Sequence, residues 1–154
     1  MIGPLILLLF CVSLGVTEAQ SQCSCAYSWT PFQNQCYRFI PVRKGHDEAE
    51  LHCQYLGGNL ASVHSEETNK FITNLITSRD NSNPQTWLGG ARISQTNYWF
   101  FKDGSAFNYQ KWGSDQPDNY CGSEGCLMIN NIVQGSWNDA ECDLELPFVC
   151  MKKM

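Results

Sequence analysis

Cysteine content is the feature of this sequence that most restricts its fold. The chain contains nine cysteines, and one of them, Cys11, lies in the apolar N-terminal segment. An even number of remaining cysteines indicates disulfides in an exported chain, although eight cysteines can pair in about a hundred ways and their spacing does not choose among these. A zinc site is the alternative, but the sequence has no pair of Cys-x-x-Cys motifs and its three histidines are scattered. The eight cysteines are Cys23, Cys25, Cys36, Cys53, Cys121, Cys126, Cys142 and Cys150.

Residues 1–19 have the composition of a secretory signal peptide. An apolar run from Leu5 to Val12 precedes small and polar residues, and Thr17 and Ala19 stand where small residues precede a cleavage site. The apolar run is too short to cross a bilayer core of about 30 Å, which disfavours the alternative of a retained membrane anchor. We therefore expect residues 20–154 to form one disulfide-stabilised domain that is secreted and does not insert into a membrane.

Charge and histidine placement argue against two classes of function. The formal net charge is −5 and no basic stripe is present, so nucleic acid is not an expected partner. His46, His52 and His64 do not accompany a Ser or Cys in a recognisable catalytic motif. A small hydrolase that combines a calcium-held carboxylate with a histidine is the alternative, but the chain has no nucleophile elbow and no helix-borne His pair. We expect structural histidines and no enzymatic activity.

Hydrophobic spacing predicts two helices. The first covers residues 47–56, buries the stripe that carries Cys53, and ends at two glycines. The second begins after Ser65, a typical N-cap residue, and stops before the loop signal at residues 81–84. The residues expected on its buried face are Phe71, Ile72, Leu75 and Ile76.

The rest of the chain has the pattern of short strands. An aromatic, turn-rich segment near the N-terminus predicts a hairpin closed by a disulfide between Cys25 and Cys36. The segment between Lys102 and Glu124 has little strand pattern, and loops of this length inside a domain are usually functional or disordered. An α+β domain is therefore expected, with strands at residues 87–89, 98–101, 126–129, 136–138 and 148–151.

Oxygen-bearing side chains are concentrated between residues 116 and 139. Calcium prefers about six to eight oxygen ligands, and this stretch can supply about six of them. About two coordination positions would remain for an external ligand. A cis bond before Pro117 would direct both flanking side chains at one ion, although a trans bond is the commoner alternative. The expected ligands are the side chains of Gln116, Asp118, Glu124, Asn138 and Asp139, with the Asp139 carbonyl.

Four features together resemble a C-type lectin domain. They are the spaced cysteines and the stretches Trp87-Leu88-Gly89-Gly90, Gln116-Pro117-Asp118 and Trp137-Asn138-Asp139. The resemblance extends from Cys25 to Met151 and implies two helices, short antiparallel or mixed sheets and a long calcium-binding loop. It also implies disulfides that join Cys25 to Cys36, Cys53 to Cys150, and Cys126 to Cys142.

The resemblance assigns the five predicted ligands a second role, which is to hydrogen-bond two vicinal sugar hydroxyls that also coordinate the ion. In the family, Gln-Pro-Asp accompanies galactose-type sugars and Glu-Pro-Asn accompanies mannose-type sugars. Tyr120 occupies the position where galactose-binding members place an aromatic ring, with loop packing as the alternative. Trp112 is expected to be a core residue. Asn119 and Gly125 replace carboxylates of an accessory calcium site, so one ion per domain is expected.

The resulting expectation is a secreted, calcium-dependent lectin for terminal galactose or N-acetylgalactosamine, acting as a multivalent agglutinin or in innate defence. Cys23 and Cys121 remain after the implied pairings. They could bond to each other or bridge two chains, and we prefer the interchain bond because weak sites gain avidity in an oligomer. The alternative function is a domain of the same fold that binds protein or a mineral surface.

Overall fold

The computed structural model describes residues 24–154, so the predicted signal peptide and Cys23 lie outside the described residues. Within this range, no helix is long and apolar enough to span a membrane. The helices are α1 (His46–Tyr55), α2 (Glu66–Arg79) and the short 3-10 helix η1 (Tyr120–Gly122). The strands are β1 (Thr30–Phe32), β2 (Gln35–Lys44), β3 (Asn59–Leu60), β4 (Thr86–Arg92), β5 (Trp99–Phe101), β6 (Glu124–Ile129), β7 (Trp137–Glu141) and β8 (Leu146–Lys153).

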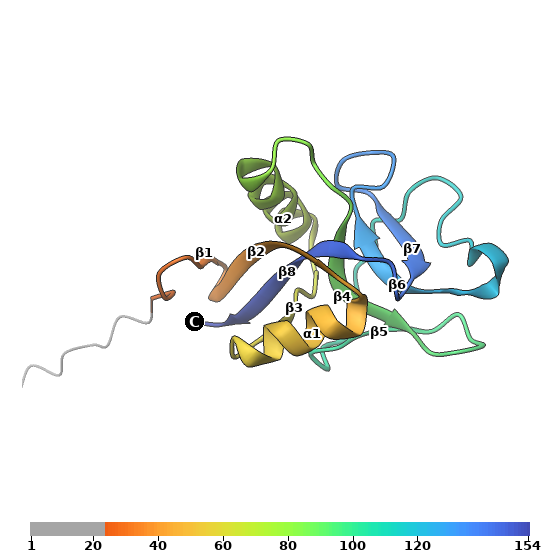
Figure 1. Ribbon diagram of the computed structural model, residues 1–154, viewed down its shortest axis with the longest axis horizontal. Helices are drawn as coiled ribbons and strands as arrows, with labels where there is room; N and C mark the ends of the chain where they lie inside the picture. The colour runs from red at the N-terminus through yellow and green to blue at the C-terminus, as the bar shows by residue number, and fades with distance from the viewer. Residues whose placement is uncertain (1–23) are drawn as a thin grey trace, which may run out of the picture.

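The strands form one mixed sheet in the order β1-β2-β8-β4-β6-β7, with β3 paired to β8 and β5 paired to β4. The pairing of β4 with β8 is parallel, through Trp87 and Phe148, and the other pairings are antiparallel. In Figure 1, β6, β7 and the long loop before β6 lie at the opposite end of the molecule from the C-terminus. The predicted α+β architecture is confirmed.

Both helices form where the sequence predicts; α2 has a side-chain N-cap, whereas α1 begins after Gly45 without one. Helix α1 starts at His46, one residue earlier than expected. Cys53 lies on its buried face, as predicted. Ser65 caps α2, because its side chain accepts a hydrogen bond from the backbone N–H of Thr68 at 3.1 Å. Phe71 differs from the prediction, because it is only half-buried and stacks on Phe32 with 4.3 Å between ring centroids.

Glycine allows β4 to pass close to its neighbours in the middle of the sheet. A Cβ atom on Gly89 would lie 2.6 Å from the Leu60 carbonyl oxygen, and one on Gly90 would lie 2.6 Å from Leu127 Cδ2. Any larger residue at either position would therefore push β4 away from β3 or from the β6 side chains. The two glycines lie where the register between β4 and β6 shifts, between Trp87 and Ala91, and they allow the close approach of β4 to both neighbours.

Three disulfides connect these elements, and they are the three that the resemblance implies. Cys25 pairs with Cys36, Cys53 with Cys150, and Cys126 with Cys142. The Cys53–Cys150 bond joins α1 to β8 and has no exposed surface at either residue. The Cys126–Cys142 bond joins β6 to the turn after β7, and therefore holds the hairpin that carries three of the predicted ligands.

His46 is a fully buried histidine with one unused nitrogen. Its Nε2–H donates to the Leu88 carbonyl at 2.8 Å, and Nδ1 is buried without a partner among residues 24–154. Protonation of Nδ1 would bury a positive charge and an N–H that has no acceptor. Burial therefore lowers the pKa of His46 from 6.5 to about 4, against the opposing effect of the Leu88 carbonyl.

We expect the calcium-free protein to lose stability as the pH falls from about 6.5 towards 4. Unfolded His46 takes a proton near pH 6.5, whereas folded His46 takes one only near pH 4, so the unfolded state binds more protons in this window. The expected loss between pH 7 and pH 5 is about 2 kcal/mol, measured by denaturant unfolding in chelator. A His46→Gln variant keeps a donor for Leu88 but does not titrate, so its stability should vary less with pH. An equally steep decline in the variant would contradict the assignment.

Candidate calcium and ligand site

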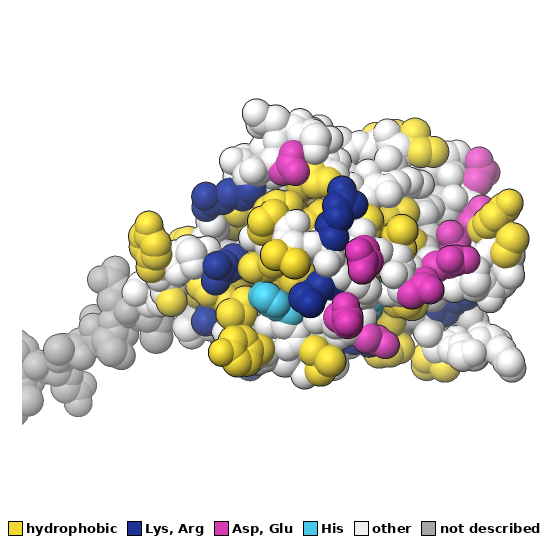
Figure 2. Space-filling view, viewed as in Figure 1, with side chains coloured by type: hydrophobic (Ala, Val, Ile, Leu, Met, Phe, Trp, Pro, Cys, Tyr) yellow, Lys and Arg dark blue, Asp and Glu magenta, His cyan; other side chains and the backbone are white. Residues whose placement is uncertain are grey.

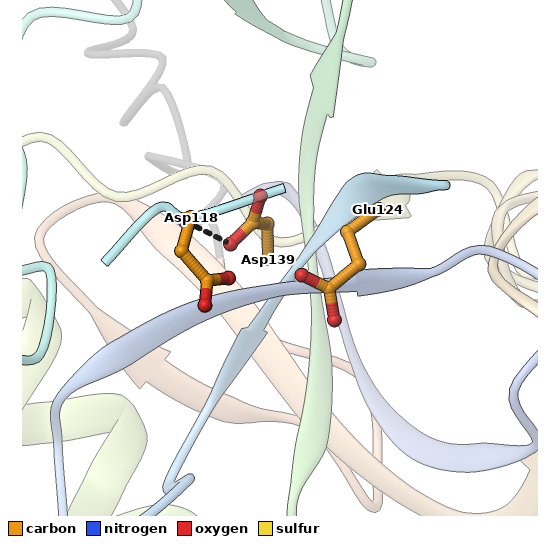
Figure 3. A group of neighbouring side chains, drawn as sticks. All are labelled: Asp118, Glu124 and Asp139. Carbon is orange, nitrogen blue, oxygen red and sulfur yellow. Dashed lines mark hydrogen bonds between the residues drawn. The ribbon is translucent and has the colours of Figure 1, made fainter. Parts of the chain in front are cut away.

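Three carboxylates from separate segments converge at the β6–β7 end of the sheet. Asp118 comes from the loop before β6, Glu124 is the first residue of β6, and Asp139 lies in β7. One oxygen of each lies within 4.8 Å of the others, and Figure 3 shows the carboxylates around a common space. Asp139 is fully buried, Glu124 is half-buried and Asp118 is exposed. The three segments therefore supply three of the five predicted ligands at one place.

The negative charges of this group disfavour one another. Burial raises the pKa of the Glu124 carboxyl, and the neighbouring carboxylates of Asp139 and Asp118 raise it further, while the N–H of Tyr120 opposes the shift. A divalent cation among these oxygens would remove both penalties, because it replaces lost hydration and neutralises the repulsion. The electrostatics of the group therefore fit a cation.

The two remaining predicted ligands carry buried oxygens without partners. Gln116 Oε1 and Asn138 Oδ1 are buried, and neither has a hydrogen-bond partner within the part of the chain that the structure describes. A buried polar atom without a partner costs about 1–3 kcal/mol, and native proteins contain few of them. Both atoms are acceptors and stand within two residues of a clustered carboxylate. A hard cation is the species that amide and carboxylate oxygens would satisfy together, so the residues fit calcium.

The loop that carries Gln116 and Asp118 is tied to β7 by backbone contacts. The carboxylate of Asp139 accepts the N–H of Asp118 at 3.1 Å and the N–H of Asn119 at 3.0 Å. The Gly113 N–H donates to the Trp137 carbonyl at 2.8 Å, so the loop is also held before the tripeptide. The Gln116–Pro117 peptide bond is cis. The loop is therefore positioned by contacts within the protein.

Arg92 is a site residue that sequence reasoning missed. Its Nη2 donates to the Asn119 side-chain oxygen and to the Glu124 carbonyl, so it joins the loop to β6. The only sequence signal for this role was an arginine at the end of a buried strand, and no known motif marks such a residue as part of a binding site.

Asn119 and Gly125 supply no carboxylate here, and the acidic cluster among the described residues comprises only the three side chains of Figure 3. One ion per domain stays a prediction.

The two aromatic residues of the loop occupy different environments. Tyr120 is 70% exposed and stands in η1, next to the carboxylate group. Trp112 is half-buried against Trp137, with 5.8 Å between ring centroids, and also lines a depression of about 660 Å³ that contains Gln116 and Asp118. Trp112 is therefore a boundary residue between the core and the depression, and the expectation of a plain core residue was only partly right.

The other residues singled out from the sequence have simple structural environments. His52 packs edge-on against Phe148, with 5.2 Å between ring centroids. His64 hydrogen-bonds Asn108 and Ser62 at the surface. Cys121 is exposed and has no disulfide partner within residues 24–154, and because Cys23 lies outside that range the pairing of these two cysteines remains a prediction.

Both the sequence and the structure of this chain are similar to those of known proteins. Residues 42–152 match the family model described as the Lectin C-type domain. A protein named "Lectin" from Pleurodeles waltl is 41% identical over 129 residues, which cover 82% of this chain and 74% of that protein. Galactose-specific lectin nattectin from Thalassophryne nattereri is 37% identical over 131 residues, covering 85% of this chain and 82% of the relative. The structure of herring type II antifreeze protein superposes with a TM-score of 0.77 at 32% identity, covering 84% of this chain and 99% of the other.

Proposed function

Because the chain belongs to the C-type lectin domain family, whose members are not enzymes, we propose that it binds terminal galactose or N-acetylgalactosamine through calcium. The observation that carries the proposal is the pair of buried, unpartnered amide oxygens beside three converging carboxylates. The similarity to galactose-specific nattectin supports the choice of sugar. The proposed calcium ligands are Gln116, Asp118, Glu124, Asn138 and Asp139.

The side chains divide the work of sugar recognition by their hydrogen-bonding chemistry. Calcium supplies a positive charge and open coordination positions for two vicinal hydroxyls. The carboxylates of Asp118 and Glu124 accept hydrogen bonds from those hydroxyls, whereas the amide groups of Gln116 and Asn138 donate through nitrogen while their oxygens face the ion. One N–H of Asn138 Nδ2 already donates to the Asp139 carbonyl, so its second N–H is the one assigned to the sugar. The amide-first, acid-last order of the tripeptide thereby sets where donors and acceptors lie. We assign the exposed ring of Tyr120 to the apolar face of the galactose ring.

A glycan array probed in calcium and again in chelator tests this proposal. We expect binding to glycans with terminal galactose or N-acetylgalactosamine, lost in chelator and competed by free galactose. Binding confined to mannose and fucose would refute the sugar assignment. Retention on a galactose column in excess chelator would show that calcium is not required.

The likeness to herring type II antifreeze protein favours a second candidate, in which the same face binds a mineral or ice surface or a protein. Thermal hysteresis of a solution of the pure protein measures ice binding. A strong hysteresis that free galactose does not reduce, together with an empty glycan array, would favour this candidate over the lectin. A complete set of calcium ligands is the reason we rank it second.

We also propose an exported oligomer. The disulfide-rich domain is consistent with an oxidising extracellular environment. One sugar site makes few contacts, so useful avidity requires several sites in one particle. A covalent dimer through Cys121 or Cys23 would provide them, and would run as a dimer in electrophoresis without reductant and as a monomer with it. A monomer band under both conditions would exclude the interchain disulfide.

A further inference from the structure

The guanidinium group of Arg92 has donors that its own protein does not use. Nη2 makes both contacts with Asn119 and Glu124. Within residues 24–154, Nε and Nη1 have no hydrogen-bond acceptor. Neither is among the fully buried polar atoms that lack a partner, so both are accessible to solvent. Arginine has five N–H donors in a planar fork that matches the geometry of a carboxylate or sulfate. Several of these donors are therefore available to a ligand.

Arg92 stands where two surface depressions meet beside the calcium ligands. One depression, of about 730 Å³, contains Glu124, and the other, of about 660 Å³, contains Gln116 and Asp118. Arg92, Asn97 and Asn119 line both depressions. A sugar held at the calcium would thus have Arg92 within the space that its substituents or its neighbouring sugar enter.

The junction of the depressions presents donors. Arginine only donates, so the Asn119 atom that faces Nη2 is the carbonyl oxygen, and the Asn119 amide nitrogen is left to donate elsewhere. The exposed amide of Asn97 adds a further adaptable donor. A group of one guanidinium and two amides, with open N–H bonds, is suited to an oxyanion.

The charge of the loaded site permits such a ligand. The three carboxylates are balanced by the two charges of a calcium ion and the one of Arg92, so the site carries no net charge to repel an anion. The protein as a whole has a net charge of −5. On the face drawn in Figure 2, Asp and Glu side chains gather on the half where β6 and β7 lie. These surface carboxylates would repel a long polyanion, whereas they would only weakly repel a single anionic group bound at Arg92.

We propose that Arg92 binds one oxyanion, a sulfate ester or a carboxylate, carried by the galactoside at the calcium site or by the sugar linked to it. This rests on the calcium-dependent galactose site proposed above and narrows its ligand to singly anionic galactosides. Arg92 then has two roles, because Nη2 holds the loop to β6 and the remaining donors bind the substituent.

Calorimetry with three matched ligands in calcium tests this inference. The ligands are methyl galactoside, its monosulfate ester, and a galactoside linked to one carboxylate-bearing sugar, and inorganic sulfate serves as a competitor. We expect at least one anionic galactoside to bind about tenfold more tightly than the neutral one, as a charge-assisted hydrogen-bond pair provides. The two anionic arms identify the source of the oxyanion. The Arg92 Nε–H NMR resonance should shift with the preferred anionic ligand and not with the neutral one.

Variants separate the guanidinium from general positive charge. Arg92→Gln should reduce the anionic-to-neutral affinity ratio to about one, and Arg92→Lys should give an intermediate ratio. Lys102→Gln is the matched control, because Lys102 lines the larger depression but its ammonium lies 2.5 Å from Asp47, so the ratio should not change. If Arg92→Gln does not fold, two other measurements test the proposal. The anionic-to-neutral affinity ratio should be intermediate in Arg92→Lys, and the same ratio of the wild-type protein should fall as salt is added.

The outcomes keep the two proposals apart. Equal or weaker binding of both anionic galactosides by the wild-type protein overturns the role of Arg92 and leaves the galactose site standing. An unchanged ratio in folded Arg92→Gln has the same effect. Failure of the neutral galactoside to bind in calcium overturns the galactose site itself.

Discussion

Replacing Asp139 with alanine is expected to abolish retention on immobilised galactose and to weaken calcium binding by more than about a hundredfold. Mutating residues that only support a metal ligand typically costs about 10–100-fold in metal affinity, and in the proposed site Asp139 both holds the loop and coordinates the ion. It is fully buried, its carboxylate belongs to the acidic cluster, and it accepts the N–H groups of Asp118 and Asn119. The substitution removes a ligand and releases the loop that carries two others. Calorimetric titration with calcium measures the effect.

Asp115→Asn provides the matched control for this prediction, because Asp115 has a φ of 61° and asparagine tolerates this left-handed conformation while removing the charge. Asp115 is exposed in the same loop, and its carboxylate accepts only the hydroxyl of Ser114, at 3.2 Å, within residues 24–154. It should bind calcium and galactose as the wild type does. Asp139→Asn, which keeps the shape but can accept only one of the two backbone N–H groups, should lie between the two variants. Full calcium affinity in folded Asp139→Ala would remove Asp139 from the ligand set and would contradict the site as drawn.

Local chemistry explains why much of the fold could be predicted. Helix α2 begins at a serine followed by two glutamates, and its apolar spacing places Ile72 and Ile76 on one buried face. The predicted ligands are recognisable because a hard cation needs oxygen atoms, and Gln116 to Asp139 is the stretch that concentrates them. The long segment before β6 was identified by its lack of strand pattern, and its irregular backbone brings Asp118 close to Glu124 and Asp139.

Tertiary contacts account for what the sequence could not provide. Arg92 reaches Asn119 and Glu124 across 27 and 32 residues, and nothing in its local sequence indicates those partners. The half-burial of Phe71 depends on Phe32 and Tyr37, which come from the N-terminal hairpin and pack against its ring. The isolation of His46 Nδ1 likewise depends on the packing of α1 against β4. These features depend on which helices and strands pack against one another, and residue type and spacing do not indicate that packing.

The second large effect concerns the bond between Cys53 and Cys150, which we expect to contribute about 4.7 kcal/mol to the free energy of unfolding. It closes a loop of 97 residues, whereas the Cys25–Cys36 bond closes one of 11. In the chain-entropy model, a short loop of about 15 residues contributes about 3 kcal/mol, so the long bond restricts the unfolded chain more. Both residues of the long bond are also fully buried, so their replacement leaves space in the core between α1 and β8.

Denaturant unfolding of two paired variants tests this order of effects. Cys53→Ala with Cys150→Ala should lose about 4.7 kcal/mol or more, a large part of the 5–15 kcal/mol by which domains are typically stable. Cys25→Ala with Cys36→Ala should lose less, because its loop is short and lies at the edge of the sheet. Since neither Cys53 nor Cys150 lines the two depressions beside the predicted calcium ligands, calcium affinity should be retained in whatever fraction of the first variant stays folded. An equal or smaller loss from the long-loop pair than from the short-loop pair would show that the unfolded chain is already compact enough to make the loop length irrelevant.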